Sequence, residues 1–184
     1  SFDFLSPFVI GGFHSLKILN EGMPAPYHDG SVGSIGLGEG AAAVVIGRDP
    51  SPFQIEEQAL FNEMYHFTAN APDGSGFAAL FERLAPALKG RRAWVKGHGT
   101  GTLEAGRLEA EAVAQYLPKA PLVSWKGSLG HTLGSCAVVE LVVALEAISS
   151  GRIPGTVQSK APFFSDSVTA DTFSGASFNS VVFT

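Results

Sequence analysis

Two histidines stand where an imidazole could act on a substrate. The stretch VKGHGTGTLEAG, residues 95–106, places His98 directly after an apolar run and follows it with glycines and threonines that leave the ring uncovered. His131 follows another apolar run, in SWKGSLGHTLGSCA, residues 124–137. His98 is predicted at the carboxyl end of a strand, where open α/β sheets collect their reactive groups. His131 is predicted in the first turn of a helix.

The chemistry available to such a pair is hydrogen-bond donation to a developing negative charge. The positive end of a helix dipole disfavours imidazolium, so His131 is expected to be neutral with an N–H free to donate. Two neutral imidazoles at neighbouring strand ends could donate to one oxyanion. Two alternatives stand beside this interpretation. The histidines could be ordinary loop residues, or half of a metal site for which only Glu109 is near in sequence.

Alternating strands and helices must position these groups. Apolar spacing, capping residues and short apolar runs define the elements. Helices are predicted over residues 6–22, 73–90, 103–117 and 131–151, and strands over residues 41–47, 53–69, 93–97, 121–125 and 176–183. The turn-rich residues 23–40 are predicted to be a loop. Alternation of this kind indicates an α/β layered fold.

Composition limits the classes of function. The 184 residues are 45% hydrophobic and 16% charged, which suits a folded chain with a core. A net charge of -5 and the absence of a basic run argue against nucleic-acid and membrane-surface binding. The single cysteine, Cys136, cannot form an internal disulfide, so a cytoplasmic location is predicted. We expect no apolar run near the ~18 residues that span a bilayer, and therefore a soluble protein.

The two histidine stretches together resemble a known family. VKGHGTGTLEAGRLEAEAV and SWKGSLGHTLGSCAVVELVVALEAISSGRIPGT are similar to the carboxyl-terminal half of the β-ketoacyl-acyl-carrier-protein synthases, with their HGTGTxxGDxxE, SxKxxxGHT and IPPT patterns. His98 and His131 match the two family histidines, Lys126 the lysine and Glu109 the acid. Upstream, GFHSLKIL and GLGEGAAAVVI also resemble family stretches.

The resemblance implies a thiolase-like layered αβαβα fold, here incomplete, and a decarboxylative Claisen condensation. Residues 1–49 would be the end of the amino-terminal half and residues 50–184 the carboxyl-terminal half. His98, His131 and Lys126 would be catalytic, with Lys126 paired to Glu109, and Thr100 and Thr102 would support the site. No metal or cofactor is implied, because acyl and malonyl groups arrive on the phosphopantetheine of a carrier protein.

The sequence departs from the family at the nucleophile. The family's reactive cysteine lies in a small-residue elbow that has no counterpart here, and Cys136 is predicted to be a buried packing thiol that acyl transfer does not need. Ala105-Gly106 replaces the family's Gly-Asp, and Arg107 follows. The Arg-Asp-Gly before GEGAA and the FGFGG loop are also missing. The chain is therefore expected to be about half of a synthase.

Two functions remain open. The chain could be part of an active synthase whose cysteine comes from an upstream segment or a separate subunit, or a non-catalytic partner of the chain-length-factor kind. The presence of His98, Lys126 and His131 favours the first. Expected partners are an acyl carrier protein and a second ketosynthase-like subunit, in a homodimer or heterodimer. A serine hydrolase and a dinucleotide binder are disfavoured, because GSVGSIGLG contains neither GxSxG nor GxGxxG before a helix.

Overall fold

A small parallel sheet lies at the centre of the molecule. The computed structural model describes residues 1–19, 21–30, 33, 35–66 and 69–184. The sheet is formed by β3 (Ala93–Lys96), β4 (Leu122–Val123) and β7 (Ser180–Phe183), in the order β4-β3-β7. In its register Val95 lies opposite Leu122 on one side and Val182 on the other.

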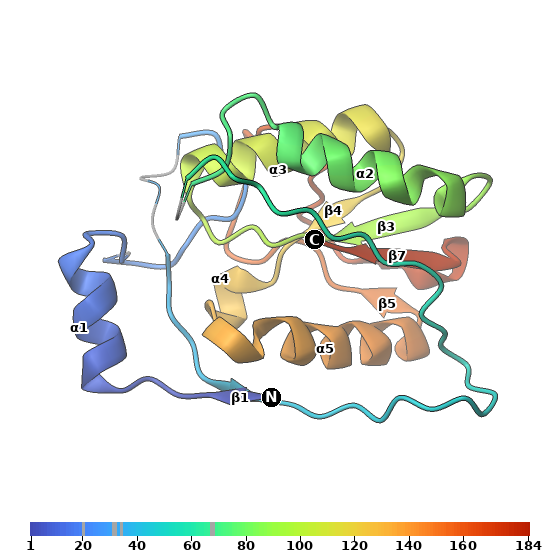
Figure 1. Cartoon of the computed structure of the whole chain (residues 1–184), viewed down its shortest axis with the longest axis horizontal. Helices are drawn as coiled ribbons and strands as arrows, with labels where there is room; N and C mark the ends of the chain where they lie inside the picture. Colours follow the sequence, from blue (N-terminus) through green and yellow to red (C-terminus); the bar gives the residue numbers. More distant parts are fainter. Residues whose placement is uncertain (20, 31–32, 34, 67–68) are drawn as a thin grey trace.

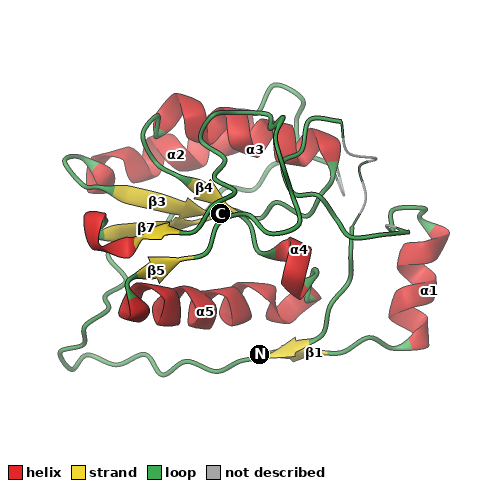
Figure 2. Ribbon diagram, turned by 180° about the vertical axis from the view of Figure 1, so that it is seen from behind, coloured by secondary structure: helices red, strands yellow, loops and turns green. Residues whose placement is uncertain are grey.

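Helices cover both faces of this sheet. The helices α2 (Ser75–Leu88) and α3 (Leu103–Tyr116) pack together on one face, and α5 (Cys136–Ser150) covers the other, as Figures 1 and 2 show. The remaining elements are short. They are α1 (Pro7–Ser15), α4 (Lys126–Leu129), β1 (Phe2–Asp3), β2 (Gly40–Ala41), β5 (Arg152–Ile153), β6 (Phe173–Ser174) and the 3-10 turns η1 (Leu133–Ser135) and η2 (Gly175–Ser177).

The central strand distributes its side chains between two apolar clusters. Successive side chains of a strand point to opposite faces. Ala93 and Val95 accordingly join a cluster beneath α2 and α3, whereas Trp94 joins a cluster with Ala144 and Ala147 of α5. Lys96 has the same parity as Trp94 and therefore faces α5. This alternation decides which groups surround the end of β3.

Helix α5 presents one narrow face to the protein interior. Its buried residues are Cys136, Glu140, Ala144 and Ala147, spaced by four, four and three positions. This spacing places them along one side of a helix. The helix ends at Gly151, whose φ of 71° is the left-handed conformation that glycine adopts readily at a helix end.

The sequence predicted most of these elements. The helices at α1, α2, α3 and α5 and the strands at β3, β4 and β7 are confirmed, as is the α/β class. His131 does not lie in a helical turn, however, because α5 begins five residues later. The boundary predicted between residues 49 and 50 stays a prediction.

Two predicted strands were wrong. Of the apolar residues 41–47, Ala41 pairs with β1 and Ala42 exchanges backbone hydrogen bonds with Ser1, whereas the side chain of Val45 is fully exposed. Residues 53–66 form no strand, and Phe67 and Thr68 of the same prediction lie outside the described residues. An apolar run becomes a strand only where a neighbouring strand accepts its hydrogen bonds. No such neighbour faces residues 43–47 in the part of the chain that the structure describes.

The prediction that no stretch has the length of a membrane span was also wrong. Among the described residues, Leu133–Ser150 has the length and apolar composition of such a span. The core helix of a soluble protein meets the same criterion. Here the stretch covers η1 and α5, which packs against the sheet and carries the ion-paired Glu140 on its interior side. These contacts place one side of the stretch against the protein interior.

Candidate active site

His98 stands on a tight loop between β3 and α3. The loop closes around Tyr27, and glycines permit the approach. A Cβ atom on Gly97 would lie 2.1 Å from the Tyr27 hydroxyl oxygen, and one on Gly99 would lie 2.6 Å from the Tyr27 ring. Ser124, directly after β4, donates its hydroxyl to the Gly99 carbonyl at 2.8 Å. The small residues after His98 thus serve loop packing as well as access to the ring.

A buried carboxylate fixes this loop. Glu109 of α3 is 2% exposed and accepts the backbone N–H groups of His98 at 2.8 Å and Gly99 at 3.0 Å. It also accepts the hydroxyl of Tyr27 at 2.7 Å and that of Thr184. Burial and the neighbouring Glu109 charge raise the pKa of Tyr27, so the hydroxyl stays protonated and able to donate. Glu109 is therefore a structural anchor for the His98 backbone.

His131 is held by a close backbone contact with the glycine-rich segment before β2. Its N–H donates to the Gly36 carbonyl at 2.6 Å, and its carbonyl accepts from the Gly38 N–H at 3.1 Å. A Cβ on Gly38 would lie 1.9 Å from the Leu129 carbonyl oxygen, so only glycine fits there. The GLGEG stretch therefore places the second histidine, although it lies almost one hundred residues upstream.

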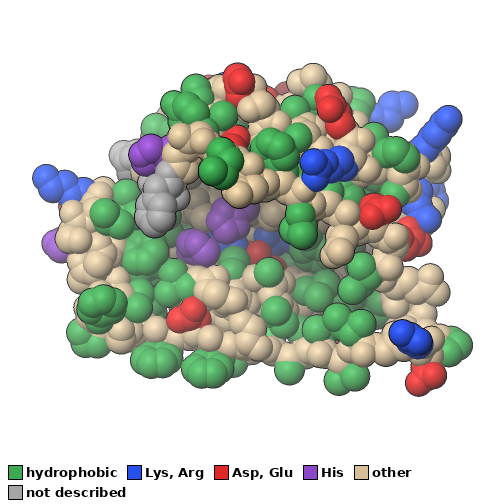
Figure 3. Space-filling view, viewed as in Figure 1, with side chains coloured by type: hydrophobic (Ala, Val, Ile, Leu, Met, Phe, Trp, Pro, Cys, Tyr) green, Lys and Arg blue, Asp and Glu red, His purple; other side chains and the backbone are tan. Residues whose placement is uncertain are grey.

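The two imidazoles meet as predicted. Their ring centroids are 5.1 Å apart and the rings are nearly perpendicular, at 88°. Figure 3 shows histidine side chains in a hollow on this face of the molecule. The His98 side chain is accessible to solvent, yet protein atoms surround it closely, as expected at the floor of a concave surface. The Nδ1 atom of His131 is buried without a hydrogen-bond partner in the described structure.

Both imidazoles are held in the neutral form. Burial lowers the pKa of His131 to about 4, with further lowering from His98 and the Lys126 charge. The pKa of His98 is lowered by burial first and then by Lys126, while Glu109 acts in the opposite direction. At neutral pH each ring therefore keeps one N–H and can act as a neutral hydrogen-bond donor.

Lys126 lies beneath the histidines, but its predicted ion pair was wrong. Its ammonium contacts the Glu140 carboxylate at 2.5 Å and not Glu109, which is occupied by the His98 loop. The Glu140 carboxylate also lies 2.7 Å from the Lys96 ammonium. Burial acts to raise the pKa of Glu140, but the two lysines outweigh it and hold that pKa below its ordinary value. Sequence reasoning missed Lys96 and Glu140, and the lone carboxylate on the apolar face of α5 was the available signal.

The other named side chains occupy supporting places. The hydroxyls of Thr100 and Thr102 lie 3.2 Å apart at the start of α3. Cys136 is buried, as predicted, but its sulfur lies against charged groups, 2.6 Å from the Lys126 ammonium and 3.5 Å from the Glu140 carboxylate.

Among the described residues, the two histidines neither belong to a metal-binding cluster nor line the cavity found elsewhere on the molecule. No group of three or more His, Cys, Asp or Glu side chains in the described ranges could hold a metal ion. A cavity of about 490 Å³ is lined by His28 and residues 157–160, and neither His98 nor His131 contributes to it. The histidine pair is therefore the chemically distinctive feature of the hollow.

The sequence is similar to one family over most of its length. The family described as beta-ketoacyl synthase, C-terminal domain, matches residues 53–160. A ketoacyl synthase alpha subunit of the tetracenomycin polyketide synthase of Streptomyces glaucescens is 28% identical over 86% of this chain and 42% of its own length. A 3-oxoacyl-[acyl-carrier-protein] synthase 2 of Synechocystis is 26% identical over 86% of the chain and 43% of its own length. The chain thus spans about two fifths of these relatives.

Solved structures share the fold. A ketosynthase in complex with its chain length factor from Xenorhabdus doucetiae has a TM-score of 0.77 at 22% identity, over 95% of this chain and 46% of that chain. The ishigamide ketosynthase/chain length factor has a TM-score of 0.75 at 20% identity, over 96% and 47%. The layered fold is therefore thiolase-like and incomplete, as predicted.

Replacing the anchoring carboxylate tests how the His98 loop is held. In Glu109→Gln, the amide nitrogen would face backbone donors, so we expect the hydrogen-exchange protection of the His98 and Gly99 amides to fall at least tenfold, the scale of a lost hydrogen bond to a charged group. Glu111→Gln, on an exposed position of the same helix, is the matched control. Equal protection in both variants would show that Glu109 does not hold the loop.

The neutral His131 makes stability depend on pH. Its pKa is about 4 in the folded protein and ~6.5 when unfolded, so the unfolded chain gains a proton first as pH falls. Its contribution is complete above pH ~6.5 and declines toward pH ~4, by at most about 2 kcal/mol between pH 6.5 and 5. Urea unfolding of wild type and His131→Gln measures the difference, with His14→Gln as control. Parallel pH curves for wild type and His131→Gln would contradict the neutral buried state.

Proposed function

The chain belongs to the β-ketoacyl synthase family, whose C-terminal domain matches residues 53–160, and we propose that it forms part of a β-ketoacyl-acyl-carrier-protein synthase. The proposed activity is an acyl transfer, the decarboxylative Claisen condensation of an acyl thioester with malonyl-carrier protein, in fatty acid or polyketide synthesis. Both groups arrive on carrier-protein phosphopantetheine, and the proposal needs no metal and no further cofactor.

The observation that carries the proposal is the close pair of neutral imidazoles. When a malonyl thioester loses carbon dioxide, the bond to the carboxylate breaks and its electron pair remains as an enolate with charge on the thioester oxygen. Donors aimed at that oxygen stabilise the charge as it forms. His98 and His131, with centroids 5.1 Å apart, can both reach one oxygen between their rings. We assign them this role.

The condensation itself needs a nucleophilic cysteine to hold the acyl group. The enolate carbon attacks the acyl carbonyl, a new carbon–carbon bond forms, and the cysteine leaves as thiolate. Cys136 does not suit this step, because its buried sulfur lies against Lys126 and Glu140 and is not at an exposed turn. We propose that the nucleophile comes from a segment or subunit outside residues 1–184, at a strand-to-helix turn that favours the thiolate. Thr100 and Thr102 are proposed to support the His98 loop.

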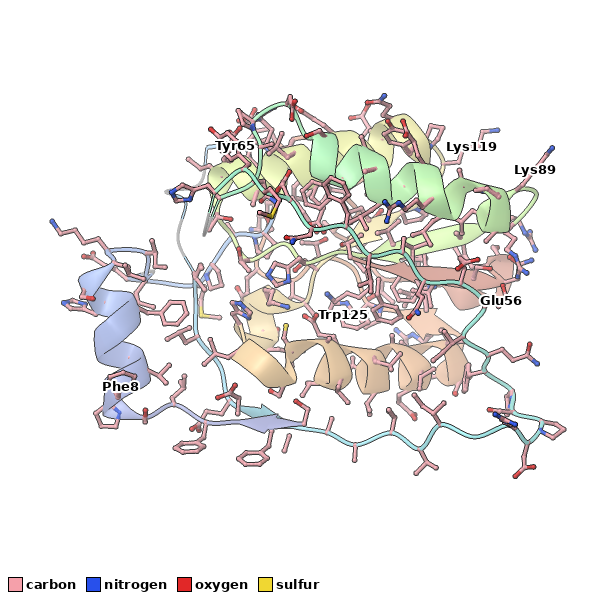
Figure 4. All side chains as sticks on the ribbon, viewed as in Figure 1. Phe8, Glu56, Tyr65, Lys89, Lys119 and Trp125 are labelled. Carbon is pink, nitrogen blue, oxygen red and sulfur yellow. The ribbon has the colours of Figure 1, made fainter. Side chains whose placement is uncertain are left out.

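The amino-terminal third of the chain exposes many large apolar side chains, which supports a contact with a second protein segment or subunit. Large exposed apolar patches mark interaction surfaces. Those exposed by more than two thirds are Phe2, Phe8, Val45, Ile46, Ile55, Leu60 and Met64. Figure 4 labels Phe8 on α1, at the edge of the molecule. We propose a second ketosynthase-like subunit or segment here, in a homodimer or heterodimer, with an acyl carrier protein as the transient partner and the cytoplasm as the location.

A chain-length-factor-like partner subunit is the second candidate, because solved ketosynthase/chain length factor complexes share this fold. Such a subunit shapes the acyl tunnel of a catalytic partner and forms no thioester. It has no chemical requirement for two neutral histidines around one oxygen, so the His98–His131 pair favours the synthase.

Removing one histidine tests the synthase directly. With the protein assembled with its cysteine-bearing segment or subunit, we expect His98→Ala to slow carbon dioxide release from malonyl-carrier protein by roughly 10²-fold, the scale of a lost oxyanion donor. His14→Ala, in α1, is the control variant. An unchanged rate in His98→Ala removes His98 from the mechanism.

Sequencing the gene on both sides of this segment locates the cysteine. A protein of only 19.2 kDa with no cysteine-bearing partner gene would overturn the synthase proposal and favour the partner-subunit function.

A further inference from the structure

A cavity outside the histidine pair contains two buried polar atoms that lack partners. The cavity has a volume of about 490 Å³ and is lined by His28, Val157, Gln158, Ser159 and Lys160. Ser159 is only 7% exposed, and its hydroxyl oxygen has no hydrogen-bond partner in the described part of the chain. The Nδ1 atom of His28 is buried without a partner in the same way. Since an unpaired buried polar atom is unfavourable, a bound molecule that supplies the missing hydrogen bonds would stabilise this region.

Backbone contacts fix the walls of this cavity. Residues 27–29 run beside residues 162–164, joined by backbone hydrogen bonds of 3.0 and 3.1 Å. On the other wall, the Val157 N–H donates to the carbonyl of Ser124, directly after β4, at 3.2 Å. The cavity is therefore formed by the fold itself, and its volume lies within the range of small-molecule sites.

Each of the two unpartnered residues follows a strained backbone position. Tyr27, before His28, and Gln158, before Ser159, both have a φ of 60°, in the left-handed region that side chains disfavour. Such strain persists only where the surrounding structure enforces it, and it is common at ligand sites. The strain therefore agrees with the unpartnered atoms in marking this cavity as a site.

The lining offers hydrogen-bond donors and a cation. Lys160 carries an ammonium group, and Ser159 carries a hydroxyl. The Gln158 amide can donate as well, and so can a ring nitrogen of His28. None of the lining residues is a carboxylate, and Asp29, the neighbour of His28, is exposed and does not line the cavity. The cavity therefore suits a ligand that carries negative charge and accepts several hydrogen bonds.

We propose that this cavity binds a small phosphate ester, with the phosphate group held by Ser159, Lys160 and His28. A phosphate group has more acceptor oxygens than a carboxylate, so it can accept hydrogen bonds from both walls at once. The volume exceeds what the phosphate needs and leaves room for the small organic group that it esterifies. Neither His98 nor His131 lines the cavity, so the inference does not rest on the proposed function.

Phosphate binding can be measured on the chain itself by NMR of ring ¹⁵N-labelled histidines, at constant pH and ionic strength. Inorganic phosphate should shift the His28 resonances along a saturable curve and leave those of His14, on α1, unchanged. Ser159→Ala should weaken binding by roughly tenfold, the scale of a lost hydrogen bond to a charged group. Lys160→Gln should weaken it too, because the ammonium is lost. Lys119→Gln, at an exposed lysine that does not line the cavity and is labelled in Figure 4, is the control.

Two results would overturn the proposal. The absence of a saturable His28 shift in the wild type would mean that the cavity takes only water. Equal phosphate affinity in the wild type, Ser159→Ala and Lys160→Gln would mean that phosphate binds elsewhere. Lys160 is exposed, so Lys160→Gln keeps the test decisive if Ser159→Ala does not fold.

A phosphate group could reach the cavity on a free ester or on the phosphopantetheine arm of a carrier protein. Glycerol 3-phosphate represents the free ester, and should shift His28 alone at least as tightly as inorganic phosphate does. If the arm is the source, phosphopantetheine shifts His28 and His98 along one curve, whereas pantetheine, which lacks the phosphate, leaves His28 unchanged. Binding of inorganic phosphate without binding of either ester overturns the assignment to an ester. Loss of the proposed synthase function would leave the phosphate titration of His28 unaffected, so the two proposals fail separately.

Discussion

The site depends on one buried carboxylate that four parts of the chain share. Glu109 reaches from α3 to the backbone of His98 and Gly99, to the hydroxyl of Tyr27 in the amino-terminal loop, and to Thr184 after β7. An ionised carboxylate has about four acceptor positions, and these partners fill them. The arrangement explains why β3, α3 and the amino-terminal loop must be assembled before His98 has a defined position. Figure 1 shows these segments converging at the centre of the fold.

A second carboxylate, that of Glu140, lies on the opposite face of β3 and pairs with two buried lysines. Glu140 comes from α5 and joins Lys96 and Lys126 beneath the site, whereas Glu109 comes from the α3 side. His98 stands where β3 ends, between these two faces. One carboxylate therefore holds the backbone of the His98 loop, and the other lies in the electrostatic environment of the ring. The proposed role of His98 depends on both carboxylates, since an imidazole must be well placed and must remain neutral to donate to an enolate.

Sequence reasoning succeeded where a local pattern carries the information. The position of His98 follows from the small residues after an apolar strand. His131 lies beyond β4 and α4, and its backbone contact with Gly36 and Gly38, which local spacing does not reveal, holds it 5.1 Å from His98. The partner of Lys126 could not be obtained in the same way, because spacing along the chain says nothing of the face on which α5 packs. The apolar residues 41–47 were misassigned for a related reason. Their composition indicates burial, but it does not name the surface that provides it.

The most direct test of the account is whether both imidazoles hold the same oxygen. A stable malonyl-pantetheine analogue with an amide in place of the thioester can be titrated into the assembled protein while the ring ¹⁵N resonances of the histidines are followed. The account predicts that His98 and His131 shift together along one binding curve and that His14, on α1, does not shift. Binding of the analogue with a shift at only one of the two histidines, or at neither, would contradict a shared oxyanion site.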